Sequence, residues 1–320
     1  MSNIFFKFIF TLVPILLCSV LNSCGPSAKE LKKEGDVLYD SANYTEAIKK
    51  YSNAIELKPK YFETLYKRGL CYSKLGNFEK SIVDFDSALV IEPKNSDIHF
   101  NLGLTQFELG QYNNALQTYL TCEELGLDDP NIILQKANCY FKLDNFSKAA
   151  GNYSLALPFF PDSLSIYLTR GISFYHSNQY QLALFDLNKY LIKKASPIIA
   201  IEYAAMSAYY LKEFGTAISY FNIIINNGEV LNAKNIDFMV KSLVAEGNKM
   251  LLLSDNENAL SLFTEALSLD PHSKDALLQR GLLFLELEKN FEACEDLNNA
   301  LINGALNATD ILKKSCPDYY

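Results

Sequence analysis

Histidine and cysteine, the side chains most used for acid–base, redox and metal chemistry near neutral pH, are few and widely spaced in this 320-residue chain. The three histidines, His99, His176 and His272, lie far apart, and none belongs to a metal-binding or catalytic motif. The seven cysteines include no CxxC pair, so neither a dithiol redox motif nor a zinc site is indicated. No GxSxG, HExxH, P-loop or GxGxxG stretch occurs. We therefore expect a protein that is not an enzyme and binds no metal or cofactor.

The charge balance argues against a nucleic-acid partner. The chain has 29 Lys and Arg against 37 Asp and Glu, a net charge of −8, and no basic run. Contacts to phosphates supply most of the affinity of nucleic-acid-binding proteins, so an acidic chain is poorly suited to that role. Hydrophobic residues make up 49% of the chain, which is too many for a disordered protein and enough for a large core.

Cys24 is the one cysteine whose surroundings indicate a chemical modification. Residues 1–23 contain a single charge, Lys7, and an apolar run from Phe8 to Leu21. The run has the length of the hydrophobic part of an export signal and is short for a membrane span. The residues Leu21-Asn22-Ser23-Cys24 that end it resemble the lipobox of bacterial lipoproteins.

This resemblance implies that acyl chains are attached to Cys24 and that the chain is cleaved before it. The mature protein would then be held at the bacterial cell envelope, on the periplasmic side of the outer membrane, with residues 24–27 as the anchor and a short linker. An ordinary secretory signal is the alternative interpretation of residues 1–23.

From residue 28 onwards, small residues recur in one phase with a period of 34. One series consists of Gly35, Gly69, Gly103, Ala137, Gly171, Ala205, Gly247 and Gly281. A second series follows twelve positions later, at Ala47, Ser81, Ala115, Ala149, Ala183, Ala217, Ala259 and Ala293. Both series contain one extra stretch of 8 residues, before Gly247. Such residues are expected where two helices pack closely, because a larger side chain would overpack the contact.

This pattern resembles the tetratricopeptide repeat, a helix–turn–helix unit of 34 residues. The resemblance implies an all-α fold, a right-handed α-solenoid of about eight repeats. Repeats 1–6 would occupy residues 28–231, repeats 7 and 8 residues 240–307, and a C-terminal capping helix and tail residues 308–320. Residues 232–239, between the sixth and seventh repeats, would be an insertion: either an extension of the next helix or a loop.

In this family the first helices of the repeats line an inner face that binds partners. That face is mapped here onto Tyr39, Tyr66, Leu70, Phe100, Leu104, Phe107, Leu134, Phe141, Leu168, Ile172, Tyr175, Met206, Tyr209 and Tyr210. Exposed apolar and aromatic stripes of this kind mark binding grooves. We expect a protein or peptide partner there, with glycan or peptidoglycan as the alternative ligand. Alternatively, several of these side chains only pack against the next helix.

Two further sets of residues carry expectations about packing. Cys294, in the last repeat, and Cys316, at the end of the capping helix, can form a disulfide in an exported protein, although both can also remain free thiols. Arg68, Arg170 and Arg280 recur beside the glycines of the first helices and are expected to be solvated or to form salt bridges.

Overall fold

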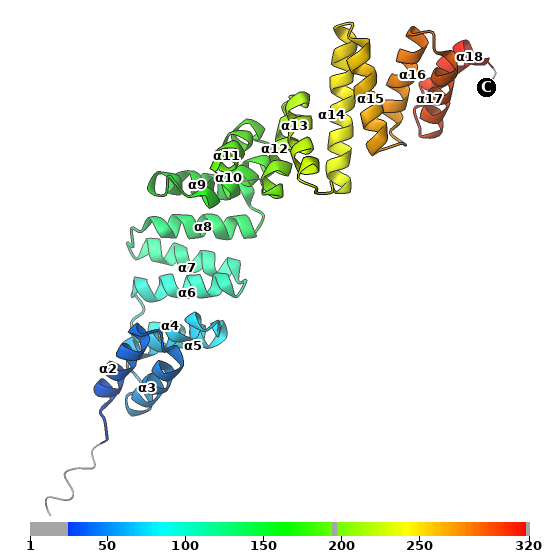
Figure 1. Cartoon of the computed structure of the whole chain (residues 1–320). Coiled ribbons are helices and arrows are strands. Elements are labelled where there is room, and N and C mark those ends of the chain that lie inside the picture. Colours follow the sequence, from blue (N-terminus) through cyan, green and yellow to red (C-terminus); the bar gives the residue numbers. More distant parts are fainter. Residues whose placement is uncertain (1–24, 194–196, 318–320) are drawn as a thin grey trace, which may run out of the picture. The chain divides into compact units, whose positions relative to one another are not determined.

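The computed structural model describes residues 25–193 and 197–317. Within these ranges the chain forms 17 α-helices, one short 3₁₀ helix and no strand (Figure 1). This confirms the predicted all-α fold. The expected signal and Cys24 lie outside the described residues. Two compact segments divide the chain: an N-terminal segment that ends at Leu143 and a C-terminal segment that begins at Asp144.

The described part of the N-terminal segment consists of consecutive helices. They are α2 (Ala28–Asp40), α3 (Tyr44–Leu57), α4 (Phe62–Lys74), α5 (Phe78–Ile91), α6 (Ser96–Glu108), α7 (Tyr112–Glu124) and α8 (Pro130–Lys142). Helices α2 and α3, α4 and α5, and α6 and α7 pack as pairs, the two helices of one repeat. The first helices of successive repeats also contact each other, from α2 through α4 and α6 to α8. This is the arrangement of stacked helix–turn–helix repeats.

The C-terminal segment repeats the same arrangement. It contains α9 (Phe146–Ala156), η1 (Leu157–Phe159), α10 (Leu164–His176), α11 (Tyr180–Lys193), α12 (Ile198–Tyr210), α13 (Phe214–Asn226), α14 (Ala233–Leu252), α15 (Asn256–Leu269), α16 (Lys274–Glu286), α17 (Asn290–Ile302) and α18 (Ala308–Ser315). The first helices α10, α12, α14 and α16 again contact one another in succession.

One residue with positive φ forms the turn between the two helices of every repeat. Its φ lies between 54° and 79° at Ala42, Gly76, Gly110, Asp144, Asn178, Lys212, Ser254 and Glu288. In the second repeat, the N–H of Asn77 donates to the carbonyl of Tyr72 (2.9 Å), which closes a Schellman-type helix end. The sequence draws attention only to the glycines of this series, because most of its members are ordinary residues in a left-handed conformation.

Within a repeat, the glycine of the first helix lies against a large side chain sixteen positions later. A Cβ placed on Gly69 would lie 2.7 Å from the ring of Phe85, and one on Gly103 would lie 2.7 Å from the ring of Tyr119. Gly69 and Gly103 are therefore needed because an aromatic ring lies directly against the helix backbone at these positions. An added methyl group would overpack this site.

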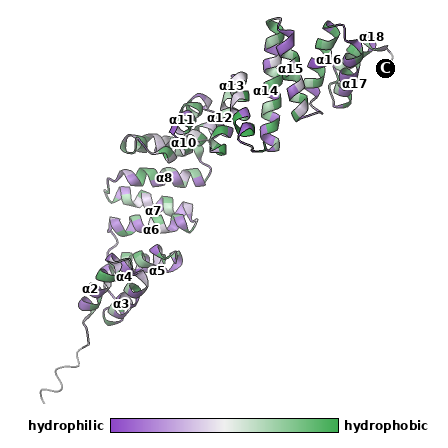
Figure 2. Ribbon diagram, in the orientation of Figure 1, coloured by the Kyte–Doolittle hydropathy of each residue, from purple (hydrophilic) through white to green (hydrophobic). Residues whose placement is uncertain are grey.

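Each helix is apolar on the side that faces its neighbours and polar on the other side. Figure 2 shows apolar and polar residues along the same helices. The largest fully buried side chains include Tyr51, Phe85, Tyr119, Phe221 and Phe263, all from second helices. Among the described helices, none combines the length and the apolar character required to cross a membrane.

Residues 233–239 form the first two turns of α14, which is 20 residues long. They therefore extend the first helix of the seventh repeat, and the alternative of an inserted loop is wrong for these residues. The side chain of Asn232 caps the helix by accepting a hydrogen bond from the N–H of Asn235 (3.0 Å).

The last helix, α18, packs against α17 and covers its apolar side. Leu312 is buried in this contact, whereas Leu306 precedes the helix and is 79% exposed. A disulfide joins Cys294 of α17 to Cys316 at the end of α18, with a Cα–Cα distance of 5.6 Å. The bond fixes the C-terminal end of the capping helix to the last repeat.

Candidate partner-binding surface

The predicted stripe residues lie on the first helices of both segments, but they are not equally accessible. Tyr210 is 45% exposed, whereas Ile172, Tyr175 and Met206 are buried. The remaining stripe residues are half-buried. The expectation that the whole stripe is exposed is therefore wrong for these three side chains. Neighbouring first helices cover them, an effect that the repeat pattern of a single helix cannot reveal.

In the N-terminal segment, the stripe begins with two tyrosines that have polar partners. The ammonium group of Lys67 lies 4.9 Å from the ring centre of Tyr39. Asn101 donates a hydrogen bond through Nδ2 to the hydroxyl of Tyr66 (3.0 Å). Burial raises the pKa of Tyr66 to about 12, so its phenol is neutral at physiological pH. Both rings are fixed in place and can offer an edge and a hydroxyl to a partner.

The central stripe residues of the N-terminal segment belong partly to the core. The ring of Phe100 lies 6.0 Å from that of Tyr119, and Phe107 lies 5.2 Å from Tyr112. Together with Leu104, they pack against a buried cluster in the third repeat. Leu70 packs in the same way against the buried cluster of the second repeat. The core-packing interpretation therefore accounts for much of this stretch. Leu134 and Phe141 are half-buried on α8.

In the C-terminal segment, aromatic rings from α10, α11, α12 and α14 form one continuous group. We refer to it as the aromatic cluster: Tyr175, His176, Tyr180, Tyr203, Tyr209, Tyr210 and Phe238. Tyr175 lies at its centre, with ring-centre distances of 4.9 Å to Tyr203 and 5.8 Å to Tyr180. The hydroxyl of Tyr175 donates to the sulfur of Met206 (3.5 Å). Tyr175 is therefore a buried side chain against which the other rings pack, and it is not available for contact with a partner.

Tyr210 is the exposed tyrosine of the aromatic cluster, in which His176 is also exposed. Its ring stacks on that of Tyr180, with centres 4.5 Å apart and planes at 11°. Phe238 contacts the rings of both Tyr209 (4.9 Å) and Tyr210 (5.6 Å) in edge-to-face geometry. Leu168 packs against the same core from α10. Such pairs hold rings in one orientation, so Tyr210 presents a rigid aromatic surface to solvent.

His176 lies at the edge of the aromatic cluster and has structural partners. Its ring stacks on Phe146 at 4.2 Å, and its Nε2 lies 3.0 Å from the hydroxyl of Tyr203. Burial and the nearby ammonium of Lys234 lower the pKa of His176, so the neutral imidazole is favoured.

The sequence analysis does not predict three members of the aromatic cluster or the lysine beside it. Tyr203 and Tyr180 lie outside the positions mapped to the inner face, and Phe238 and Lys234 belong to the extension of α14. Lys234 and Phe238 could have been predicted to lie together, because residues four positions apart share one face of a helix. That prediction requires residues 232–239 to be helical.

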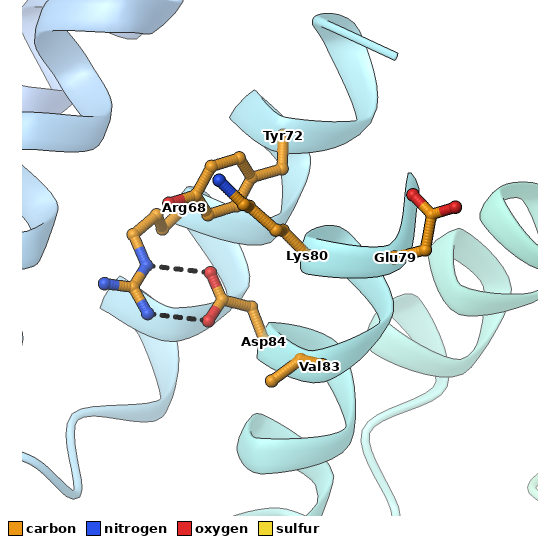
Figure 3. Close-up of a pocket in the computed structure, with 6 residues that line it drawn as sticks. All are labelled: Arg68, Tyr72, Glu79, Lys80, Val83 and Asp84. Carbon is orange, nitrogen blue, oxygen red and sulfur yellow. Dashed lines mark hydrogen bonds and ion pairs between the residues drawn. The ribbon is translucent and has the colours of Figure 1, made fainter. Parts of the chain in front are cut away.

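The recurring arginines pair with aspartates of the second helices. Arg68 donates through Nε and Nη2 to the two carboxylate oxygens of Asp84, at 2.8 and 2.7 Å (Figure 3). A shallow pocket beside this pair is lined by Arg68, Tyr72, Glu79, Lys80, Val83 and Asp84. Within the described residues no group of His, Cys, Asp and Glu is arranged to hold a metal ion.

The cysteines outside the disulfide are buried. Burial raises the pKa of Cys71 and Cys139 to about 12 and that of Cys122 to about 11. All three thiols are therefore protonated at neutral pH, which makes them poor nucleophiles. They act as small apolar residues at helix contacts.

Comparison with known protein families identifies the repeats directly. A family model described as TPR repeat matches residues 35–76, and two models described as tetratricopeptide repeat match residues 62–95 and 85–117. A search of curated proteins gave no match.

Solved structures share the fold. A tetratricopeptide repeat protein from Parabacteroides merdae aligns over 81% of this chain and 100% of its own, with a TM-score of 0.50 and 19% identity. The C-terminal part of a TPR repeat-containing protein from Cytophaga hutchinsonii aligns over 77% of this chain and 98% of its own, with a TM-score of 0.51 and 19% identity. YrrB, a TPR protein with an unusual peptide-binding site, aligns over 55% of this chain and 90% of its own, with a TM-score of 0.50 and 19% identity.

At this identity the structural matches show the fold alone. The family models add sequence evidence within residues 35–117. The same helix pairs, turn geometry and contacts of a glycine with a large side chain sixteen positions later continue through both segments of the described chain. Residues 35–117 therefore match tetratricopeptide repeats in sequence, and the described residues share the fold of tetratricopeptide-repeat proteins.

Proposed function

We propose that this chain is a non-enzymatic scaffold at the bacterial cell envelope that binds a protein or peptide partner through the inner faces of its repeats. The observation that carries the proposal is Tyr210, a 45% exposed ring held rigidly by Tyr180 and Phe238. Rigid, partly exposed aromatic residues dominate the binding energy of protein interfaces. Repeat arrays of this kind commonly bind partners along the face formed by successive helices.

A peptide suits this surface better than a glycan. Sugar rings bind aromatic residues by stacking on an open ring face, and the stacked pair Tyr180 and Tyr210 covers one face of each ring. The edges and hydroxyls that remain suit the side chains and backbone of a peptide. Glycan binding would be seen as heat release on addition of glycan fragments where peptides give none.

The second part of the proposal concerns the anchor. The lipobox-like residues that end at Cys24 support attachment of acyl chains, and a small number of such chains holds a domain firmly on a bilayer. Only residues 25–27 separate Cys24 from α2, and three extended residues span about 10 Å. The first repeat would therefore lie close to the membrane surface. An assembly or secretion complex of the envelope is a suitable setting for such a scaffold.

The binding site is tested by crosslinking and pull-down of the lipidated protein from membranes, with Tyr210→Ser as the test variant. We expect capture of the partner to fall by about tenfold or more, because an exposed anchor is lost. The melting temperature should fall by only about 2–4 °C, because Tyr210 also packs on Tyr180 and Phe238. Phe291→Ser is the matched control, since Phe291 is 69% exposed on α17, outside the aromatic cluster. Equal capture by both variants would contradict the proposed site.

The anchor is tested separately with Cys24→Ser. We expect this variant to move from the membrane fraction to the soluble fraction while its helical circular dichroism spectrum is retained. Mass spectrometry of the wild-type N-terminus should find acyl chains on Cys24. An N-terminus cleaved elsewhere and free of lipid would support the ordinary secretory signal.

A further inference from the structure

The extension of α14 adds a cation to the aromatic cluster that the 34-residue repeat does not supply. From the position of Lys234 we infer that the peptide bound at the aromatic cluster is acidic there: a carboxylate, from Asp, Glu or a chain terminus, pairs with Lys234 beside an aromatic or aliphatic side chain that contacts Tyr210. This inference rests on the proposed function and specifies the chemistry of its partner.

The extension is fixed firmly enough to position this cation. Asn232 and Asn235 both donate through Nδ2 to Oε1 of Glu202, which lies on α12. Asn235 is 1% exposed, and Phe238 is buried against the cluster. The helix that carries Lys234 is therefore tied to α12 by side-chain hydrogen bonds as well as by packing. Glu202 accepts both amide hydrogen bonds through Oε1, and it forms no ion pair with Lys234.

Lys234 is the unpaired cation of α14. Its exposed ammonium lies 6.0 Å from the ring centres of both Tyr175 and Phe238. No carboxylate lies within ion-pair distance of it among the described residues. Two other lysines of the helix are paired, Lys241 with Asp237 (2.7 Å) and Lys249 with Glu246 (2.7 Å).

The surroundings of Lys234 favour an anion from outside the chain. A cation over ring faces at this distance gains little, and its neighbours Tyr175, Phe238 and His176 bring no negative charge. A partner's carboxylate would find a positive charge beside apolar surface, where an ion pair is screened less than in bulk water. A cationic ligand would meet repulsion from Lys234 at the same ring faces. The cluster therefore selects the sign of the partner's charge.

The test uses the full-length lipidated protein in detergent and three pools of fluorescent decapeptides. All pools share the same aromatic and aliphatic positions, and the remaining positions carry Asp and Glu, Asn and Gln, or Lys and Arg. We expect the acidic pool to bind about tenfold more tightly than the neutral pool in fluorescence polarisation, and the basic pool to bind most weakly. Raising NaCl from about 0.1 to about 0.5 M should weaken only the binding of the acidic pool.

The variant Lys234→Gln should lower the affinity of the acidic pool to that of the neutral pool and leave the neutral pool unchanged. Lys234→Arg should keep the preference. Lys249→Gln is the matched control, because it removes an exposed lysine of the same helix that already has a partner. Since Lys234 is exposed, the melting curve of Lys234→Gln should match that of the wild type.

The outcomes separate this inference from the proposed function. Binding of all pools with equal affinity, or a preference that survives Lys234→Gln, would overturn the acidic partner and leave peptide binding intact. A preference for the basic pool would overturn it as well. If no pool binds, both the proposed function and this inference fail.

Discussion

The guanidinium of Arg170 on α10 donates to both carboxylate oxygens of Asp186 on α11, at 2.7 Å from Nε and 2.8 Å from Nη2. Asp186 is 1% exposed, so this bidentate pair lies inside the repeat. The same positions, sixteen residues apart, form pairs in three other repeats: Glu34–Lys50, Arg68–Asp84 and Arg280–Asp296. In the first repeat the signs of the charges are reversed. The geometry of the helix pair therefore sets the position of the ion pair, and either orientation of charge can occupy it.

Removal of one member of the buried pair should be costly. Arg170→Met leaves the Asp186 carboxylate buried without its partner, and we expect the free energy of unfolding near pH 7.5 to fall by about 3–5 kcal/mol. The double variant Arg170→Met, Asp186→Leu removes both charges and should recover most of this loss. Urea denaturation followed by circular dichroism measures both variants. Lys241→Met, which breaks the exposed pair with Asp237, is the control and should cost less than about 1 kcal/mol.

The same variant should show a particular pH dependence. Burial raises the pKa of Asp186, and Arg170 opposes this by favouring the carboxylate. Without Arg170, the folded-state pKa lies further above the unfolded value of about 3.9. The folded variant then takes up a proton more readily than the unfolded chain, so its stability is greatest at acidic pH and is lost as pH rises through the folded-state pKa. A penalty that is constant between pH 4 and pH 8 would contradict this explanation.

The repeat fold could be predicted from the sequence because its strongest constraints are local. Gly69 and Ser81 stand twelve positions apart in one helix pair, and this spacing recurs along the chain with one interruption. The recurrence of Arg68 in the sequence predicts a salt bridge but does not by itself identify the partner. The partner is Asp84, sixteen positions later, and this spacing is visible in the printed sequence.

The candidate site was predicted less well, because exposure depends on neighbouring helices. The repeat register mapped both Tyr175 and Tyr210 to the inner face, yet Tyr175 is 8% exposed and Tyr210 is 45% exposed. The difference arises because Tyr175, on α10, packs against Tyr180 of α11 and against Tyr203 and Met206 of α12. A substitution of Tyr175 would therefore disturb the core, so Tyr210 is the informative residue for binding.

Two buried tyrosines at the same register should respond in opposite ways to loss of the hydroxyl. Tyr51 donates to Oδ1 of Asp36 (2.8 Å), whereas the hydroxyl of Tyr119 has no hydrogen-bond partner among the described residues. Tyr51→Phe should lower stability by about 1 kcal/mol. Tyr119→Phe should leave stability unchanged or raise it by about 1 kcal/mol, because an unsatisfied buried group is removed. Thermal melts of the two variants provide the comparison, and equal losses would show that Tyr119 has a partner such as a bound water.

The disulfide should stabilise only the C-terminal end of the array. The double variant Cys294→Ser, Cys316→Ser opens a loop with a sequence separation of 22, so the loss is up to about 3 kcal/mol. Repeats contact only their neighbours, and faster hydrogen exchange should be confined to α16, α17 and α18. Helices α2 to α8 should exchange as in the wild type. A free thiol at Cys294 in mass spectra of the non-reduced protein would contradict the bond.

The turn between the helices of a repeat can be tested with two Gly→Ala substitutions that have equal space for the added methyl group. A Cβ on Gly76 or on Gly151 would meet no atom within 4 Å, so packing is the same in both cases. Gly76 has a φ of 73°, where a Cβ is strained, and Gly76→Ala should lower stability by about 1 kcal/mol. Gly151 lies within α9, and Gly151→Ala should raise stability by about 0.5–1 kcal/mol through the higher helix propensity of alanine. A denaturation midpoint for Gly76→Ala equal to or above that of the wild type would show that the positive φ of the turn carries no energetic cost.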